Sequence, residues 1–462
     1  MTMWSPDITG RTGPRYKAIA DALAADIAAG RLAPGDRLPT HRDLADRLDL
    51  TVGTVTRAYA EAERRGLLRG EVGRGTFVRT VGDRYDPLLE PARDPASELI
   101  ELGLNLPLDC EGPDLAEVLR ELGQHPDVST LLGYQPFTGS DRYRRMGVDW
   151  IARHGLDVDP EQVVITAGAQ HAIVVALSAL CHAGDVVLTE ALTYPGLKTA
   201  ASLLGLEAVP VAMDDQGLLP DDLERAARDT GARVLYCMPT LHNPTTATMS
   251  VERRRAVADV ARRLDLQVIE DDVHGLLAPE SPAPMMALMP ERTLYIASTS
   301  KVLAGGLRVA FVAAPGDLVE RLAFAVAASM WALPALSLEV AARWIADGTA
   351  AVITDRKREE ASARQELAGR ILPAGRVQTS GQSYFLWLEL TPPWRCEHFV
   401  RAARERGVAV ASAEAFTTGK AAPPDAVRVS LSAPTDRAEV AAGLQTLADM
   451  LDQGPAPASA IV

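Results

Sequence analysis

The chain has 462 residues, 47% of them hydrophobic, and a formal net charge of −14. This length exceeds what one ordinary core supports, so we expect more than one domain in a globular protein. The charge argues against a protein that coats nucleic acid along its whole length. However, residues 1–80 hold 13 Lys and Arg against 10 Asp and Glu, which is compatible with a DNA-contacting N-terminal part on an acidic body.

Four cysteines lie far apart in the sequence and form no C-x-x-C pair: Cys110, Cys181, Cys237 and Cys396. We therefore expect reduced cysteines in a cytoplasmic protein, with neither a disulfide framework nor a metal site. The sequence shows no signal peptide and no apolar run long enough to cross a bilayer, so we expect no membrane partner.

Residues 11–80 carry three helix-like patterns followed by two short strand-like runs. Thr40 and Thr51 are placed to cap the second and third helices, and Gly73-Arg74-Gly75 separates the two runs. This order predicts a winged helix-turn-helix whose third helix enters the major groove. A small helical domain with solvated charges is the plain alternative.

Candidate DNA contacts lie at the first turns of the second and third helices and at the hairpin tip. We expect five side chains there to reach bases or phosphates: Arg42, Thr51, Thr54, Arg57 and Arg74. Residues 81–98 contain three prolines and no hydrophobic periodicity, which predicts a linker.

From residue 99 to 450, strand-like runs alternate with helical patterns, as is typical of an α/β domain. Polar motifs follow several of these runs, at the end of the strands where ligands bind in open α/β sheets. They are Gly168-Ala-Gln170, Tyr194-Pro195, Asn243-Pro244, Asp271-Asp272 and Ser298-x-Ser-Lys301-x6-Arg308. Of the two adjacent acids, we expect one to lie in a solvated turn.

Lys301 stands between two apolar runs, residues 294–297 and 309–314. A lysine in such surroundings must be paired or held neutral. A partly desolvated neutral amine is the nucleophile that forms a Schiff base with an aldehyde such as pyridoxal phosphate. The neighbouring hydroxyls and Arg308 are suited to a phosphate, whereas the plain alternative is a surface lysine on a loop.

The joint order of these motifs resembles the fold-type I pyridoxal-phosphate aminotransferases across residues 99–450. The segment Gly30-Arg-Leu-x-Pro-Gly-Asp-x-Leu-Pro39, the Thr-rich third helix and Gly73-Arg-Gly-Thr-Phe-Val78 resemble the GntR-type DNA-binding domain. The whole chain thus resembles the MocR type of GntR-family regulators. This implies a winged helix-turn-helix before an α/β aminotransferase-like domain with a smaller C-terminal α+β subdomain, pyridoxal 5'-phosphate as cofactor, and a homodimer.

The resemblance also implies a role for each matching residue. Lys301 would carry the cofactor covalently, Asp271 would pair with its pyridine nitrogen, and Arg428 would bind the carboxylate of an amino-acid effector. Asn243 and His274 would hold the phenolic oxygen. The remaining implied contacts are Tyr194 with the ring and, with the phosphate, Ala169, Gln170, Ser298, Ser300, Arg308 and the partner subunit's Tyr134.

Four positions depart from the family pattern. His274 stands where tyrosine is usual, Gly305 where proline is common, and Ala310 and Thr246 where glycine is common. A histidine can still donate a hydrogen bond, but we expect it to titrate near neutral pH. These differences bear on catalytic efficiency more than on cofactor binding.

The resemblance implies a transcriptional regulator that binds operator DNA and senses an amino compound through aldimine exchange at Lys301. One alternative is an active aminotransferase with an appended DNA-binding domain. Another is a regulator whose large domain only dimerises, and the presence of Lys301 and Asp271 counts against it.

Overall fold

The structure is a computed structural model. It describes residues 4–6, 14–33, 36–64, 67–71, 75–78, 99–110, 112, 114–419 and 421–455. The chain forms two compact units, Met1–Leu89 and Glu90–Val462. No helix within the described ranges is long and apolar enough to span a membrane.

The first unit consists of three helices and a hairpin. They are α1 (Arg15–Ala28), α2 (His41–Leu48), α3 (Val52–Arg64) and the antiparallel pair β1 (Leu68–Glu71) and β2 (Gly75–Val78). Thr40 Oγ1 accepts a hydrogen bond from Asp43 N (3.2 Å), and Thr51 Oγ1 accepts one from Thr54 N (3.2 Å). Both predicted helix caps are therefore present, and Val55, Tyr59 and Ala62 of α3 are buried in the core.

The second unit is built on a seven-stranded sheet in the order β4-β12-β11-β10-β9-β5-β6. β12 runs antiparallel to both neighbours, and the other pairs are parallel. The strands are β4 (Val163–Thr166), β5 (Val186–Glu190), β6 (Glu207–Val211), β9 (Val234–Cys237), β10 (Gln267–Asp271), β11 (Thr293–Ser298) and β12 (Ala310–Ala313).

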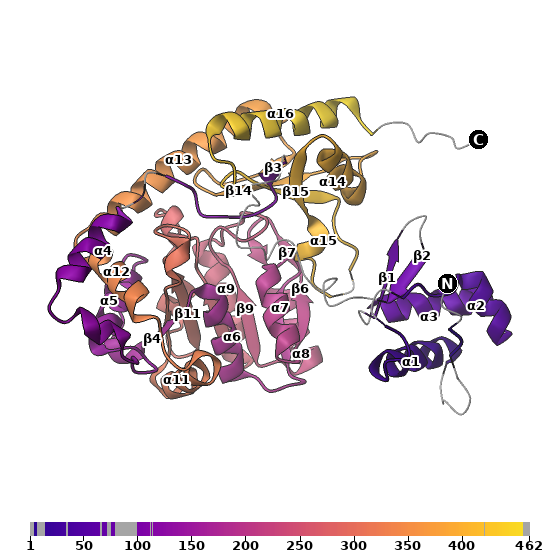
Figure 1. The fold of residues 1–462 in the computed structure, drawn as a ribbon, viewed down its shortest axis with the longest axis horizontal. Coiled ribbons are helices and arrows are strands. Elements are labelled where there is room, and N and C mark those ends of the chain that lie inside the picture. Colours follow the sequence, from indigo (N-terminus) through magenta and orange to yellow (C-terminus); the bar gives the residue numbers. More distant parts are fainter. Residues whose placement is uncertain are drawn as a thin grey trace. The chain divides into compact units, whose positions relative to one another are not determined.

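Helices pack on both faces of this sheet, so alternate strand residues enter two cores. Leu235 and Cys237 of β9 pack with residues of α8 and α9, whereas Val234 and Tyr236 face the core that contains α6. The helices around the sheet (Figure 1) are α5 (Asp141–Ala152), α6 (Ala169–Leu180), α7 (Pro195–Leu203), α8 (Pro220–Thr230), α9 (Val251–Arg263), α10 (Met285–Leu288), α11 (Gly316–Met330) and α12 (Ala335–Ala346).

A smaller five-stranded sheet has the order β13-β14-β16-β15-β3. Its strands are β13 (Val377–Gln378), β14 (Phe385–Glu389), β15 (Val408–Ser412), β16 (Ala426–Ser430) and β3 (Ile100–Leu102). β3 comes from the start of the unit, yet it pairs in parallel with β15 (Figure 1). The smaller subdomain is thus not made of C-terminal residues alone, which the sequence did not reveal.

Four further helices accompany the small sheet and the start of the unit. They are α4 (Leu115–Gln124), α13 (Thr349–Ile371), α14 (Cys396–Glu405) and α16 (Arg437–Gln453), and the short α15 (Ala413–Phe416) follows β15. The predicted fold class, a helix-turn-helix region with an α/β domain, is confirmed.

Candidate functional site

The polar motifs of the larger unit converge at the carboxyl edge of the seven-stranded sheet. Tyr194, Asn243 and Lys301 follow β5, β9 and β11, and Asp271 is the last residue of β10. Because these four strands are parallel, their carboxyl ends lie at the same edge. Residues spread over more than a hundred positions therefore share one site.

Lys301 is half-buried, and its Nζ donates a hydrogen bond to the main-chain oxygen of Asn105. Burial, together with Arg428, Lys357 and Arg308, lowers the pKa of Lys301 to about 7. A substantial share of the amine is therefore neutral at neutral pH, as a nucleophile toward an aldehyde requires. The main-chain oxygen of Lys301 accepts a hydrogen bond from the Tyr384 hydroxyl (2.8 Å).

Asp271 has one occupied and one open oxygen. Its Oδ2 accepts a hydrogen bond from the Tyr236 hydroxyl (2.6 Å), and its buried Oδ1 has no hydrogen-bond partner among the described residues. Burial raises the pKa of Asp271 to about 6. An open buried carboxylate oxygen costs free energy unless a donor reaches it, and the N–H of a protonated pyridine ring fits that need.

The expectation that one of the paired acids is solvated is wrong. Asp272 is 4% exposed, and its Oδ2 accepts hydrogen bonds from the Tyr295 hydroxyl (2.5 Å) and from His154 Nδ1 (3.1 Å). The preceding Glu270 is also buried and accepts from the main-chain N–H groups of Met285 and Met286. The acidic run stays buried because each carboxylate has its own donors.

The start of α6 and the segment after β11 form a cradle for an anion. Gly168 precedes α6 with φ +85°, and Arg308 donates from Nη2 to Ala167 O (3.3 Å). A Cβ on Gly168 would lie 2.4 Å from Arg308 Nη2, so this close approach depends on glycine. Ser300 Oγ accepts from Arg308 Nη1 at 3.5 Å, and Ser298 Oγ accepts from Ser300 N at 3.2 Å. Free N–H groups at a helix start, two hydroxyls and a guanidinium suit a phosphate.

Arg428 lies on β16, 3% exposed, between two aromatic rings. Its Cζ is 5.6 Å from the ring centroid of Phe385 and 4.8 Å from that of Phe416. Its Nη1 donates to Asn243 Oδ1 (2.8 Å), and its Nη2 donates to Gly103 O (2.5 Å). The structure therefore brings the predicted effector-binding arginine next to the predicted phenolic-oxygen ligand.

Sequence reasoning missed the segment from Glu101 to Asn105. Glu101 Oε1 accepts from the N–H groups of Gly103 (2.6 Å) and Leu104 (3.0 Å), which fixes the main chain after β3. The oxygens of Gly103 and Asn105 then receive the hydrogen bonds from Arg428 and Lys301. A polar Asn between two leucines was the local signal for this segment, but only β3 pairing places it at the site.

His274 is buried, with its Nε2 3.3 Å from Asn105 Nδ2 and its ring edge-on to Phe385. Burial, together with Lys301, Arg428 and His242, lowers the pKa of His274 well below its ordinary value. The expectation that this residue titrates near neutral pH is therefore wrong, and the imidazole is neutral at pH 7.

Three of the predicted cofactor contacts, Tyr194, Gln170 and Tyr134, have different surroundings in the structure. Tyr194 is half-buried, and a Cβ on Gly196 would lie 2.3 Å from its Cε1, so the ring lies against that turn. Gln170 Nε2 donates to Gly196 O (2.9 Å), which ties the start of α6 to the same turn. Tyr134, by contrast, is 84% exposed and has no hydrogen bond to the Lys301 site within the described residues.

Four of the five predicted DNA contacts lie among the described residues of the first unit, and their side chains are exposed or partly exposed. Arg42 and Arg57 are exposed, and the hydroxyls of Thr51 and Thr54 are 2.9 Å apart at the start of α3. Thr51 thus caps α3 as well as facing solvent. Arg74 lies outside the described residues.

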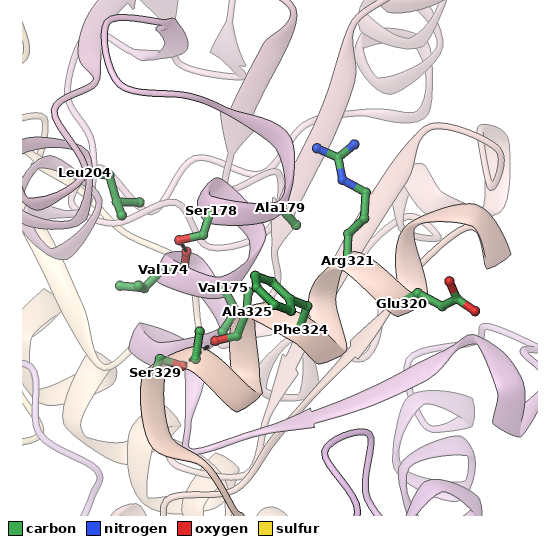
Figure 2. A pocket seen from close by; sticks show the side chains of 11 residues that line it. Val174, Val175, Ser178, Ala179, Leu204, Glu320, Arg321, Phe324, Ala325 and Ser329 are labelled. Atoms are coloured by element: carbon green, nitrogen blue, oxygen red, sulfur yellow. Dashed lines mark hydrogen bonds between the residues drawn. The ribbon is translucent and has the colours of Figure 1, made fainter.

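A separate hollow of about 510 Å³ lies between α6 and α11. Figure 2 shows the ring of Phe324 on α11 beside Val175 and Ala325 in this hollow, and Phe324 is 76% exposed. His171 links this region to the anion cradle, because its Nδ1 accepts from Ala167 N (3.0 Å) and its Nε2 lies 2.7 Å from Ser329 Oγ.

The two units together define a class of protein: a winged helix-turn-helix fused to an aminotransferase-type α/β unit. Residues 97–447 match the aminotransferase class I and II family, and residues 15–78 match the gntR family of bacterial regulatory proteins. The chain is 36% identical over 450 residues to the HTH-type transcriptional regulator YdeF of Bacillus subtilis (strain 168), covering 97% of each chain.

A second relative is the vitamin B6 salvage pathway transcriptional repressor PtsJ of Salmonella typhimurium, 30% identical over 92% of this chain and 96% of the relative. Among solved structures, LysN, an alpha-aminoadipate aminotransferase of Thermus thermophilus in complex with N-(5'-phosphopyridoxyl)-L-leucine, superimposes with a TM-score of 0.69. It is 25% identical and covers 86% of this chain and 98% of LysN. The chain belongs to the GntR family of bacterial regulatory proteins, and within it to the MocR type.

Proposed function

We propose that this regulator binds operator DNA through its first unit and senses a small amino compound at Lys301 in its second unit, with pyridoxal 5'-phosphate as cofactor. One observation carries the proposal. Lys301 and Arg428 donate hydrogen bonds to the main-chain oxygens of Asn105 and Gly103, two residues apart on one segment. A reactive amine and a cationic anchor therefore lie side by side.

The residues present fit this cofactor. Asp271 Oδ1 supplies the open acceptor for a pyridine N–H, Asn243 and His274 supply donors for the phenolic oxygen, and Tyr194 lies near the ring site. The start of α6 and Arg308, with Ser298 and Ser300, would hold the phosphate. When bound, pyridoxal phosphate supplies an aldehyde that bonds covalently to primary amines and a ring that withdraws electrons.

The ligand class follows from Arg428. Its guanidinium is desolvated between Phe385 and Phe416, where an anionic partner gains more than it would in water. We therefore propose a primary amine that also carries an acidic group, such as an amino acid. The amine would compete with Lys301 for the cofactor, and its acidic group would bind Arg428.

We also propose a cytoplasmic homodimer. Several large apolar side chains are exposed on the segment before α5 and at the junction of α11 and α12, including Leu132 (91%) and Trp331 (62%). The Phe137 and Trp331 rings lie 5.8 Å apart, so these two segments form one surface. A second copy would cover it and bring the partner's Tyr134 to the phosphate site.

The test is a DNA-binding assay on the full chain loaded with pyridoxal phosphate. A DNA fragment selected by the protein from a random library is titrated with and without a panel of amino acids and other amines, and 2-oxo acids are added to follow keto-product formation. We expect one class of amine to change both the cofactor spectrum and DNA affinity, and Lys301→Ala to abolish the response. Turnover at roughly 1 per second or faster with DNA binding indifferent to every amine would favour an active aminotransferase.

A further inference from the structure

Asn105 touches two functional groups of the site at once. Its main-chain oxygen accepts from Lys301 Nζ, and its side-chain Nδ2 is 3.3 Å from His274 Nε2. The remaining side-chain atom, Oδ1, is buried without a hydrogen-bond partner in the described part of the chain, and so is His274 Nδ1. The Asn105 amide and the His274 imidazole are therefore in contact with each other, and each has one further buried polar atom without a hydrogen-bond partner among the described residues.

Only two proton arrangements satisfy this pair. In the first, Asn105 Nδ2 donates to an unprotonated His274 Nε2, and the proton of the neutral imidazole sits on Nδ1. In the second, the Asn105 amide is rotated by 180°, His274 Nε2–H donates to its oxygen, and Nδ1 is a bare acceptor. The imidazole is neutral in both, since Lys301, Arg428 and burial oppose a second proton.

We propose that Asn105 is a positioning residue that fixes His274 in the Nδ1–H tautomer, so that this histidine donates to the cofactor's phenolic oxygen. The phenolic oxygen is an acceptor, and only the first arrangement leaves His274 a free donor. Asn105 thereby lets a histidine serve where a tyrosine hydroxyl, which needs no tautomer selection, is usual in the aminotransferase-like domain. The role of the donor rests on the proposed cofactor site, whereas the tautomer itself does not.

The tautomer is measured directly on the full chain without added cofactor. Long-range ¹H–¹⁵N spectra of the ¹⁵N-histidine-labelled protein distinguish a protonated ring nitrogen from a bare one, and His274→Tyr identifies the His274 signals by their loss. We expect Nδ1 protonated and Nε2 bare in the natural chain. In Asn105→Asp, the carboxylate can only accept, so we expect a proton on Nε2. A protonated Nε2 in the natural chain, or a bare Nε2 in Asn105→Asp, would overturn the assignment.

The consequence for the cofactor is tested by a double-mutant cycle. Asn105→Ala should weaken pyridoxal phosphate binding roughly tenfold when residue 274 is His, the worth of about one hydrogen bond. The same change should have little effect in His274→Tyr, because a hydroxyl donates without tautomer selection. Equal losses in both backgrounds would show that Asn105 acts only by packing. If no variant bound the cofactor at all, the proposed function would fail while the spectra still decided the tautomer.

Discussion

The reactivity of the Lys301 amine should depend on pH near neutrality. Its pKa of about 7 predicts that covalent capture of pyridoxal phosphate accelerates as pH rises through 7, because only the neutral amine attacks the aldehyde. The measurement is borohydride reduction at timed intervals, followed by mass spectrometry of the Lys301 peptide. Arg428→Gln removes one of the charges that depress this pKa, so its profile should shift to higher pH. A profile with no midpoint below pH 9 would contradict the prediction.

The same group affects folding. Its folded-state pKa lies below the ordinary value of 10.5, so the unfolded chain binds more protons between pH 7 and 10.5. The contribution of Lys301 to stability is therefore lowest below pH 7 and rises with pH across that window. Lys301→Met should flatten the corresponding part of the stability profile.

Substitutions of the two adjacent aspartates should have different effects, one on cofactor affinity and the other on the stability of the fold. Asp271→Asn removes the negative charge that would favour a protonated ring nitrogen at the open Oδ1, so we expect a large loss of pyridoxal phosphate affinity in a folded protein. Asp272→Asn weakens the contacts with Tyr295 and His154, so we expect about 1–3 kcal/mol of lost stability. Absorbance titration and chemical denaturation measure the two effects. Equal losses of affinity in both variants would mean that neither oxygen is specific for the ring.

Thr246 holds a backbone conformation that suits glycine better. Its φ is +64°, and it is 5% exposed beside Asn243. A β-branched residue is strained in the left-handed region, so Thr246→Gly should stabilise the protein by about 1 kcal/mol. Thr245→Gly is the matched control, since Thr245 Oγ1 bonds His242 Nδ1 (2.8 Å) and its loss should destabilise. The denaturant midpoint should rise in Thr246→Gly and fall in Thr245→Gly, and an unchanged or lower midpoint in Thr246→Gly would contradict the prediction.

At the scale of elements, a substitution at the start of α6 tests most directly whether the anion cradle binds the phosphate. In Gly168→Ala, the added Cβ would displace Arg308, so we expect a strong loss of affinity for pyridoxal phosphate but little for pyridoxal, which lacks the phosphate. Gly184→Ala shares the positive φ (+95°) but has open space for the Cβ, so it controls for backbone strain. A similar loss of affinity in both variants would place the phosphate elsewhere.

The elements and motifs at strand ends could be predicted because their signals are local. Runs such as residues 294–297 identify buried strands, and ligand residues follow parallel strands at one edge. Asn105 and Tyr236 could not be found this way, since the residues that they contact lie between 35 and 196 positions away in the sequence. The burial of Asp272 depends on Tyr295 and His154, which no local pattern connects to it.

At the scale of the whole molecule, DNA binding should depend on a few arginines, because the first unit is only mildly basic. We expect Arg42→Ala and Arg57→Ala each to weaken DNA binding. Each should also reduce the magnitude of the slope of log affinity against log salt concentration by about 1, the contribution of one phosphate contact. Arg57→Ala should also relax base preference. Arg31, which pairs with Asp26 at 2.5 Å, supplies the control substitution with no expected effect. Unchanged affinity in both test variants would refute the placement of α2 and α3 on DNA.

The position of β3 in the small sheet determines which hydrogen bonds would first resist a force applied to the chain that precedes it. Among the described residues of the second unit, the chain begins at Leu99 and continues directly into β3, where Ile100 N donates to Gly407 O (2.8 Å). A pull on that chain would therefore load the β3–β15 hydrogen bonds before it reached the seven-stranded sheet. Gly103 and Asn105 lie one and three residues after β3. The strand that would bear the force and the main-chain oxygens that contact Arg428 and Lys301 are therefore within six residues of each other in the sequence.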